Sequence, residues 1–251
     1  MLNTLIHGDR TDAPPLLIVH GLFGSARNWG VIAKRLSDTR QVAVVDMRNH
    51  GDSPWMDSHT YPDMADDLAK VIEEIGTPAD VMGHSMGGKA AMVLALTRPD
   101  LVRRLIVADI APIAYAHTQA GPLNAMRGVD LSSIASRKDA QAQMDIDDAT
   151  ATFLLQSLDL ANRRWKLNLD VLGRDMDAIV GWPDTPGRFD GPTLFLRGGR
   201  SAYVPDSAEP AIRAAFPQAR IETVSDAGHW LHAEQPRAVE AAVRAFLEGH
   251  A

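Results

Sequence analysis

The chain has 251 residues, of which 45% are hydrophobic and 23% charged, so it can form one domain with a sizeable core, or one domain carrying a large insertion. Its formal net charge is -7, and its basic residues form no run or face of the kind that nucleic acid requires, which argues against such a partner. The absence of cysteine excludes disulfides, thiolate metal sites and a cysteine nucleophile.

The amino-terminal segment MLNTLIHGDR lacks the basic start and the apolar stretch of a signal peptide. The longest apolar run, around residues 90–96, is far too short to span a bilayer. We therefore expect a soluble, cytoplasmic protein with no membrane partner.

Short apolar runs alternate along the chain with longer segments of helical periodicity, which is the pattern of an α/β protein: a mostly parallel sheet with helices on both faces. Strands are predicted at residues 16–20, 42–46, 80–83, 105–109, 193–197 and 220–224, with residues 2–7 as an additional edge strand. Helices are predicted near residues 26–37, 64–75, 86–97, 208–215 and 237–248.

Residues 111–191 interrupt this alternation. They contain no convincing strand, but amphipathic helical stretches are predicted at residues 147–160 and 161–172, punctuated by glycine and proline. A structureless loop of this length is uncommon in a compact domain. We therefore predict a helical cap over residues 111–191, inserted into a core formed by residues 1–110 and 192–251.

The sequence G-H-S-M-G at residues 83–87 lies between a predicted strand and a predicted helix. A sharp strand-to-helix turn exposes the central hydroxyl, that of Ser85, and glycines on either side leave room for the turn. The helix amino terminus behind it favours developing negative charge. A glycine-rich helix cap with an incidental serine is the alternative, and the dinucleotide pattern G-x-G-x-x-G is absent. The context favours Ser85 as a nucleophile.

The segment H-G-L-F-G at residues 20–24 follows the first long predicted strand. A chain that turns sharply there can aim a backbone N–H at the same place as the N–H of Met86. Two such donors form an oxyanion hole, in which each donor stabilises the transition state by about 3 kcal/mol. A simple turn that caps the following helix is the alternative.

A serine nucleophile needs a base with a near-neutral pKa, and histidine is the natural candidate. His229 lies in the loop after the last predicted strand, and an early serine with a late histidine is the chain order of one large class of serine hydrolases. A surface histidine is the alternative. We interpret His20 and His84 as local structural groups, and His232 as a neighbour of the base without its role.

Two acidic segments are interpreted as structural. Asp46 and Ser53 are expected to hold a tight loop through hydrogen bonds between side chain and backbone, and a catalytic role for Asp46 is the alternative. Residues 145–148 resemble the start of a calcium loop, but Thr150 stands at its glycine position and Gln156 at its bidentate glutamate position. We therefore predict a helix amino terminus there and no metal site.

Four segments carry a family resemblance: HGLFGS at residues 20–25, DMRNHGDS at 46–53, GHSMGGK at 83–89 and GHWLHAE at 228–234. Together they resemble the α/β-hydrolase superfamily, and most of all its small carboxylesterases, which occur in bacteria and have mitochondrial relatives. The resemblance covers nearly the whole chain and is weakest in the predicted cap. It implies the α/β-hydrolase fold, no cofactor, no metal, and acyl transfer to water through an acyl-serine intermediate. It also implies nucleophile Ser85, base His229, and the backbone N–H groups of Leu22 and Met86 as oxyanion donors.

The chain departs from the family pattern at the acid. Most members carry an aspartate just after the strand predicted here at residues 193–197, where this chain has Ser201. A carboxylate can also reach the histidine from the end of the preceding strand, where Asp109 stands. The resemblance implies that Asp109 orients His229 and that Ser201 assists, while a turn-capping carboxylate is the alternative for Asp109.

We therefore expect an esterase or thioesterase whose partner is a small-molecule acyl ester or thioester. Trp230, which directly follows His229, and Phe23, which follows the expected oxyanion donor Leu22, predict a narrow substrate cleft that favours short acyl chains. A C–C bond hydrolase, a lactonase or a perhydrolase on the same scaffold is the alternative, and a non-catalytic binding protein is the alternative from another class. The sequence does not determine the oligomeric state.

Overall fold

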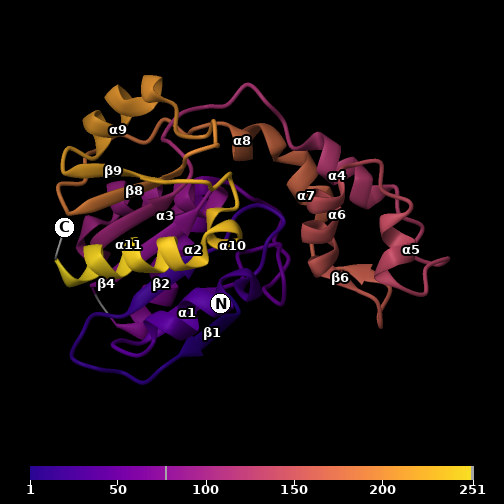
Figure 1. Ribbon diagram of the computed structural model, residues 1–251, viewed down its shortest axis with the longest axis horizontal. Helices are drawn as coiled ribbons and strands as arrows, with labels where there is room; N and C mark the ends of the chain where they lie inside the picture. Colours follow the sequence, from indigo (N-terminus) through magenta and orange to yellow (C-terminus); the bar gives the residue numbers. More distant parts are fainter. Residues whose placement is uncertain (77, 250–251) are drawn as a thin grey trace.

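The computed structural model describes residues 1–76 and 78–249, and it is built around a seven-stranded sheet in the order β1-β3-β2-β4-β5-β8-β9 (Figure 1). β1 pairs antiparallel with β3, and the other neighbouring strands are parallel. The predicted strands, including the edge strand, are confirmed. Their bounds are β1 Thr4–His7, β2 Leu16–Val19, β3 Val42–Val45, β4 Ala79–His84, β5 Val102–Ala108, β8 Thr193–Gly198 and β9 Ala219–Val224.

Helices cover both faces of this sheet, which explains why β2 (LLIV) and β3 (VAVV) are apolar at every position. Alternate residues of β2 belong to different cores: Leu16 and Ile18 pack with α1 and α11, whereas Leu17 and Val19 pack with α2 and α3. The helices of these two layers are η1 Ala26–Trp29, α1 Gly30–Leu36, α2 Tyr61–Ile75, α3 Met86–Thr97, η2 Pro99–Leu101, η4 Asp206–Ala208, α9 Glu209–Ala215, α10 Leu231–Glu234 and α11 Pro236–Glu248.

The segment between β5 and β8 is mainly helical and lies to one side of the sheet (Figure 1). We call residues 111–191 the cap segment. Its elements are α4 Ala120–Arg127, α5 Arg137–Gln141, α6 Asp148–Leu154, η3 Leu155–Ser157, β6 Leu158–Asp159, β7 Arg164–Trp165, α7 Leu169–Arg174 and α8 Met176–Val180. None of the helices in residues 1–76 and 78–249 is long and apolar enough to cross a membrane.

The helix predicted over residues 161–172 is wrong for residues 161–168, whereas residues 169–172 belong to α7. The antiparallel strands β6 and β7 occupy this region, joined by a turn in which Arg163 has a φ of 49°. Asp159 accepts hydrogen bonds from the backbone and side chain of Asn162, and such local bonds compete with helix formation. Asn168 then caps α7, whose first residue is Leu169. The preceding helix, α6, also ends earlier than the sequence predicts.

Candidate active site

The carboxyl ends of β2, β4, β5 and β8 lie at one edge of the sheet, because these strands are parallel. This edge is where open α/β sheets bind their ligands. Ser85 follows β4 directly, Asp109 follows β5, and Ser201 comes soon after β8. The loop after β9 brings His229 to the same place.

Ser85 occupies a sharp turn between β4 and α3, with φ 52° and ψ -121°. A Cβ on Gly83 would lie 2.2 Å from the carbonyl oxygen of Gly87, and a Cβ on Gly87 would lie 2.4 Å from the carbonyl oxygen of His20. No side chain fits at such distances, so the turn requires glycine at both positions, as the sequence indicates.

Ser85, His229 and Asp109 form a continuous chain of hydrogen bonds. The hydroxyl oxygen of Ser85 is 3.0 Å from Nε2 of His229. On the opposite side of the ring, Nδ1 of His229 is 2.7 Å from Oδ2 of Asp109. When Nδ1 carries the proton and donates it to the carboxylate, Nε2 is free to accept the hydroxyl proton of Ser85. The arrangement can therefore generate a nucleophilic serine.

Asp109 is fully buried, and protein groups satisfy both of its carboxylate oxygens. Oδ1 accepts the backbone N–H of Gly198 at 2.8 Å, and Oδ2 accepts the hydroxyl of Ser201 as well as Nδ1 of His229. Ser201 thus bonds to Asp109 rather than to His229. Asp109 itself has a φ of 51°, in the left-handed region.

Other carboxylates near this edge lie elsewhere. Asp206 forms an exposed ion pair with Arg197, and the exposed residue Asp226 precedes the base in its own loop. Asp109 is therefore the carboxylate that the structure places against His229.

The oxyanion turn covers residues 21–24 and is closed by a hydrogen bond from the N–H of Gly24 to the carbonyl of Gly21, 3.0 Å long. Leu22 of this turn and Met86 at the start of α3 line the same cavity as Ser85. Within the described residues, neither of their N–H groups donates a hydrogen bond to the protein. For Met86 this is expected, since the first N–H groups of a helix have no partner within it.

The cavity beside Ser85 has a volume of about 420 Å³ and lies between the sheet edge and the cap segment. Phe23 and Trp230, the predicted substrate-binding residues, both line it. Trp230 packs against Phe153 of α6, with ring centroids 5.2 Å apart. The walls of the cavity are therefore largely apolar, and the cap segment contributes to them.

Three buried imidazoles, those of His20, His84 and His232, line the same cavity as Ser85. Nε2 of His20 accepts the N–H of Met47 at 3.0 Å, and Nε2 of His84 donates to the carbonyl of His229 at 2.8 Å. Burial lowers the pKa of both rings, so they stay neutral. His232 stacks on Trp29, and burial lowers its pKa to about 4. These contacts agree with a structural interpretation of the three histidines.

The loop after β3 is also structural, as the sequence predicts. Oδ1 of Asp46 accepts the N–H of Ala26 at 2.7 Å, and Oδ2 accepts the N–H of Asp52 at 2.9 Å. The hydroxyl of Ser53 donates to the carbonyl of Asp46 at 2.5 Å. Both carboxylate oxygens of Asp46 are thus engaged away from His229.

Two residues that line the cavity, Tyr203 and Lys89, are not predicted from the sequence. The ring of Tyr203 stacks on His229 with centroids 3.8 Å apart. Lys89 of α3 is almost completely buried, and its Nζ donates to the carbonyls of Val180 and Gly181 at 3.0 and 2.5 Å. Desolvation lowers the pKa of Lys89 to about 7. The only feature of the sequence that points to Lys89 as a site residue is its position near the start of α3, four residues after Ser85.

Within residues 1–76 and 78–249, no three His, Asp or Glu side chains lie close enough together to hold a metal ion.

Comparison with known proteins gives three kinds of similarity. Residues 14–236 match a family model described as alpha/beta hydrolase fold. The mouse protein named sn-1-specific diacylglycerol lipase ABHD11 is 42% identical, over 97% of this chain and 83% of its own length. Esterase YbfF of Escherichia coli K12 is 40% identical, over 93% of this chain and 92% of its own. A solved structure named marine microorganism esterase superposes with a TM-score of 0.91 at 36% identity, covering 98% of both chains.

Proposed function

The chain belongs to the α/β-hydrolase fold family and is a carboxylic ester hydrolase, and we propose that Ser85 is its nucleophile and His229 its general base. The observation that carries this assignment is the hydrogen-bond chain from Ser85 through His229 to Asp109, with distances of 3.0 and 2.7 Å. Esterase and lipase names among the relatives agree with it.

In the proposed mechanism, Nε2 of His229 takes the hydroxyl proton as Oγ of Ser85 bonds to the ester carbonyl carbon. The carbonyl oxygen becomes an oxyanion, which the N–H groups of Leu22 and Met86 stabilise by about 3 kcal/mol each. The carboxylate of Asp109 stabilises the imidazolium that forms on His229.

Collapse of this intermediate breaks the bond to the alcohol, and His229 returns the proton to the leaving oxygen. Water then attacks the acyl-serine by the same route, with His229 again accepting a proton, and releases the acid. Neither half-reaction requires a metal or a cofactor.

The proposed substrates are small-molecule esters with short acyl groups, and thioesters of the same acids are included in the proposal. A cavity of about 420 Å³ is near the lower end of the range for ligand sites, and Trp230 and Phe23 form part of its wall. We also propose that residues 111–191 act as a cap over a core formed by residues 1–110 and 192–251, since α6 and α8 supply part of the cavity wall. We propose a cytoplasmic protein that acts on this substrate without a membrane or nucleic acid as partner.

Two measurements test this function. A fluorophosphonate probe should form one adduct, on the peptide that contains Ser85. A panel of p-nitrophenyl esters and acyl-CoA thioesters, both graded from two to twelve acyl carbons, should give the highest kcat/KM with the shorter esters. Absence of both labelling and hydrolysis would indicate a non-catalytic scaffold. Labelling without turnover of any ester or thioester would favour a lactone or a C–C bond as substrate.

A further inference from the structure

Phe23 has an unusual backbone conformation for its residue type. It is the third residue of the oxyanion turn and has a φ of 62°. Turns of this kind normally place glycine at such a position, because a side chain disfavours positive φ. Phe23 is also buried, with 3% of its surface exposed. The surrounding protein must therefore hold this residue in place.

His50 holds the backbone of Phe23 from the core side. The N–H of Phe23 donates to Nε2 of His50 at 3.1 Å, and Nδ1 of His50 is 2.9 Å from the carbonyl of Arg48. The second contact requires the proton on Nδ1, which leaves Nε2 as the acceptor. Burial and the nearby rings of His20 and His59 lower the pKa of His50 well below its ordinary value, so Nε2 stays unprotonated.

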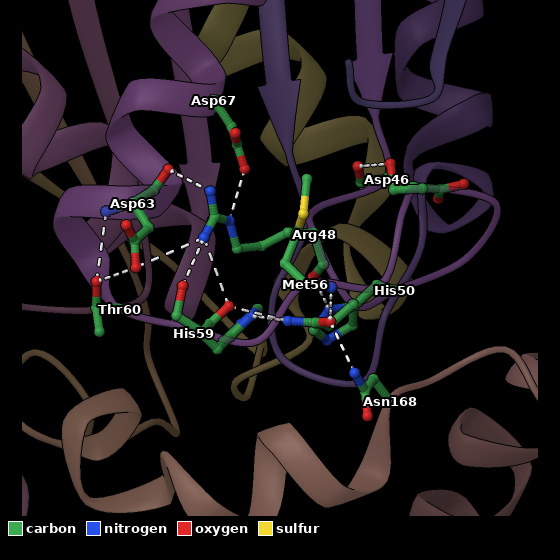
Figure 2. Close-up of polar contacts among 12 residues, drawn as sticks. Asp46, Arg48, His50, Met56, His59, Thr60, Asp63, Asp67 and Asn168 are labelled. Atoms are coloured by element: carbon green, nitrogen blue, oxygen red, sulfur yellow. Dashed lines mark hydrogen bonds and ion pairs between the residues drawn. The ribbon is translucent and has the colours of Figure 1, made fainter.

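The position of His50 is itself fixed by its neighbours (Figure 2). Arg48 points toward α2, where its Nε lies 2.6 Å from Oδ2 of Asp67. Asn49 is fully buried, and its side-chain oxygen accepts from the N–H of Met56 at 2.8 Å and from Asn168 of the cap segment at 3.1 Å. His50 thus lies in a loop anchored both to α2 and to the cap segment.

The cap segment also holds Phe23 directly. The hydroxyl of Ser157 in η3 donates to the carbonyl of Phe23 at 3.1 Å. Both polar backbone groups of Phe23 are therefore engaged, the N–H by His50 and the carbonyl by Ser157. The N–H of the preceding residue, Leu22, has no acceptor among the described residues.

We propose that His50 and Ser157 are positioning residues, which hold Phe23 in its left-handed conformation and thereby fix the turn that presents the Leu22 N–H to the oxyanion. Without the acceptor on His50, the peptide between Leu22 and Phe23 can rotate until φ of Phe23 becomes negative. Rotation of this peptide alone leaves the N–H of Leu22 in place, because that N–H belongs to the preceding peptide. The donor is displaced when loss of the bonds to Phe23 lets the backbone of residues 21–24 rearrange as a whole. This inference rests on the proposed role of Leu22.

The test compares His50→Phe, which fills the same space without an acceptor, with His50→Gln, whose side-chain oxygen can accept the N–H. We expect His50→Phe to lower kcat about 30-fold with KM nearly unchanged, since a misplaced oxyanion donor loses part of its contribution. The inhibition constant of a trifluoromethyl ketone, which forms an oxyanion on Ser85, should rise by a similar factor. His50→Gln should recover most of both losses.

Ser157→Ala should show the same pattern at about 3- to 10-fold, on the order of one neutral hydrogen bond. Lys166→Met is the matched control, because Lys166 joins the cap segment to Asp52 in the same loop without touching Phe23, and it should leave both constants unchanged. All values are taken per active site titrated with fluorophosphonate, so a smaller folded fraction does not imitate the effect. Should His50→Phe fail to fold, Ser157→Ala and His50→Gln carry the test.

Wild-type kcat and ketone affinity in folded His50→Phe would overturn the positioning role. A fall in kcat without weaker ketone binding would overturn it too, because a misplaced oxyanion donor must affect both. These outcomes leave wild-type hydrolysis and the labelling of Ser85 intact. Failure of the proposed function would instead appear in the wild-type protein itself, as no turnover and no adduct.

Discussion

Oδ2 of Asp109 lies 2.7 Å from Nδ1 of His229, although 120 residues separate the two in the chain. The carboxylate comes from the end of β5, and the position after β8 is occupied by Ser201, whose hydroxyl donates to the same oxygen. The carboxylate that faces His229 thus follows β5, and the hydroxyl that bonds to this carboxylate follows the neighbouring strand, β8.

We expect Asp109→Asn to lower turnover about 10⁴-fold, because an amide at this place favours the wrong tautomer of His229. Ser201→Ala should cost only about 10-fold, on the order of one hydrogen bond to a group that keeps its charge. The check is kcat of both variants side by side, with circular dichroism to confirm folding. The assignment of the acid is wrong if Ser201→Ala is the more damaging change.

Ser85→Ala should fold normally and lose turnover by about 10⁶-fold, since the substitution removes only the nucleophilic oxygen. The thermal midpoint and the esterase rate of purified protein check both parts of this expectation. Ser133→Ala is a suitable control, because Ser133 is an exposed serine of the cap segment. Retention of more than a tenth of wild-type turnover would contradict the role of Ser85.

Trp230→Ala should extend the range of accepted acyl chains, because the indole packs against Phe153 at the wall of the cavity. The measurement is kcat/KM for esters from two to twelve acyl carbons, where the optimum should move to longer chains. Trp55→Ala controls for the loss of an indole, since Trp55 is 56% exposed and lies outside the cavity. A wild-type enzyme whose rate already rises up to twelve carbons would exclude a narrow pocket.

Lys89 should make the free energy of unfolding depend on pH above about pH 7. Its pKa is lowered to about 7 in the folded protein, whereas an unfolded lysine keeps its proton to pH 10.5. The unfolded chain therefore binds more protons between these values, and stability should rise with pH by up to about 1.4 kcal/mol per unit. Urea unfolding from pH 7 to 9 measures this slope.

Lys89→Met should remove most of that slope, because the titrating group is gone. Lys34→Met, at an exposed position of α1, should preserve it. Equal slopes in wild type and Lys89→Met would show that the buried ammonium does not titrate in this range.

Much of the core and of the site can be predicted from the sequence, because the chemistry stands at the ends of buried strands. β2 is a continuous apolar run, β4 is mostly apolar, and a glycine-rich turn follows each, so the positions of Leu22, Ser85 and Met86 follow from local pattern. Asp109 is predictable for a related reason, since parallel neighbouring strands end at the same edge.

The cap segment is less predictable, because its short elements depend on local side-chain bonds and on contacts with the core. Residues 161–164 have helical composition, yet Asp159 and Asn162 stabilise a turn instead. Lys89 has no local signal of burial, since its acceptors lie more than 90 residues away in α8 and the turn after it. The bond between His50 and Phe23 likewise exists only in the folded chain.

The positive φ values of Phe23, Ser85 and Asp109 have a joint thermodynamic consequence. Each such conformation costs about 1–2 kcal/mol for a residue other than glycine, asparagine or aspartate, so Phe23 and Ser85 together store about 2–4 kcal/mol. That is a large part of the roughly 5–15 kcal/mol by which a typical protein is stable. Local loosening at this edge of the sheet would release that energy and displace Phe23, Ser85 and Asp109 together. The contacts of the surrounding fold must therefore offset this strain to keep the proposed catalytic residues in place.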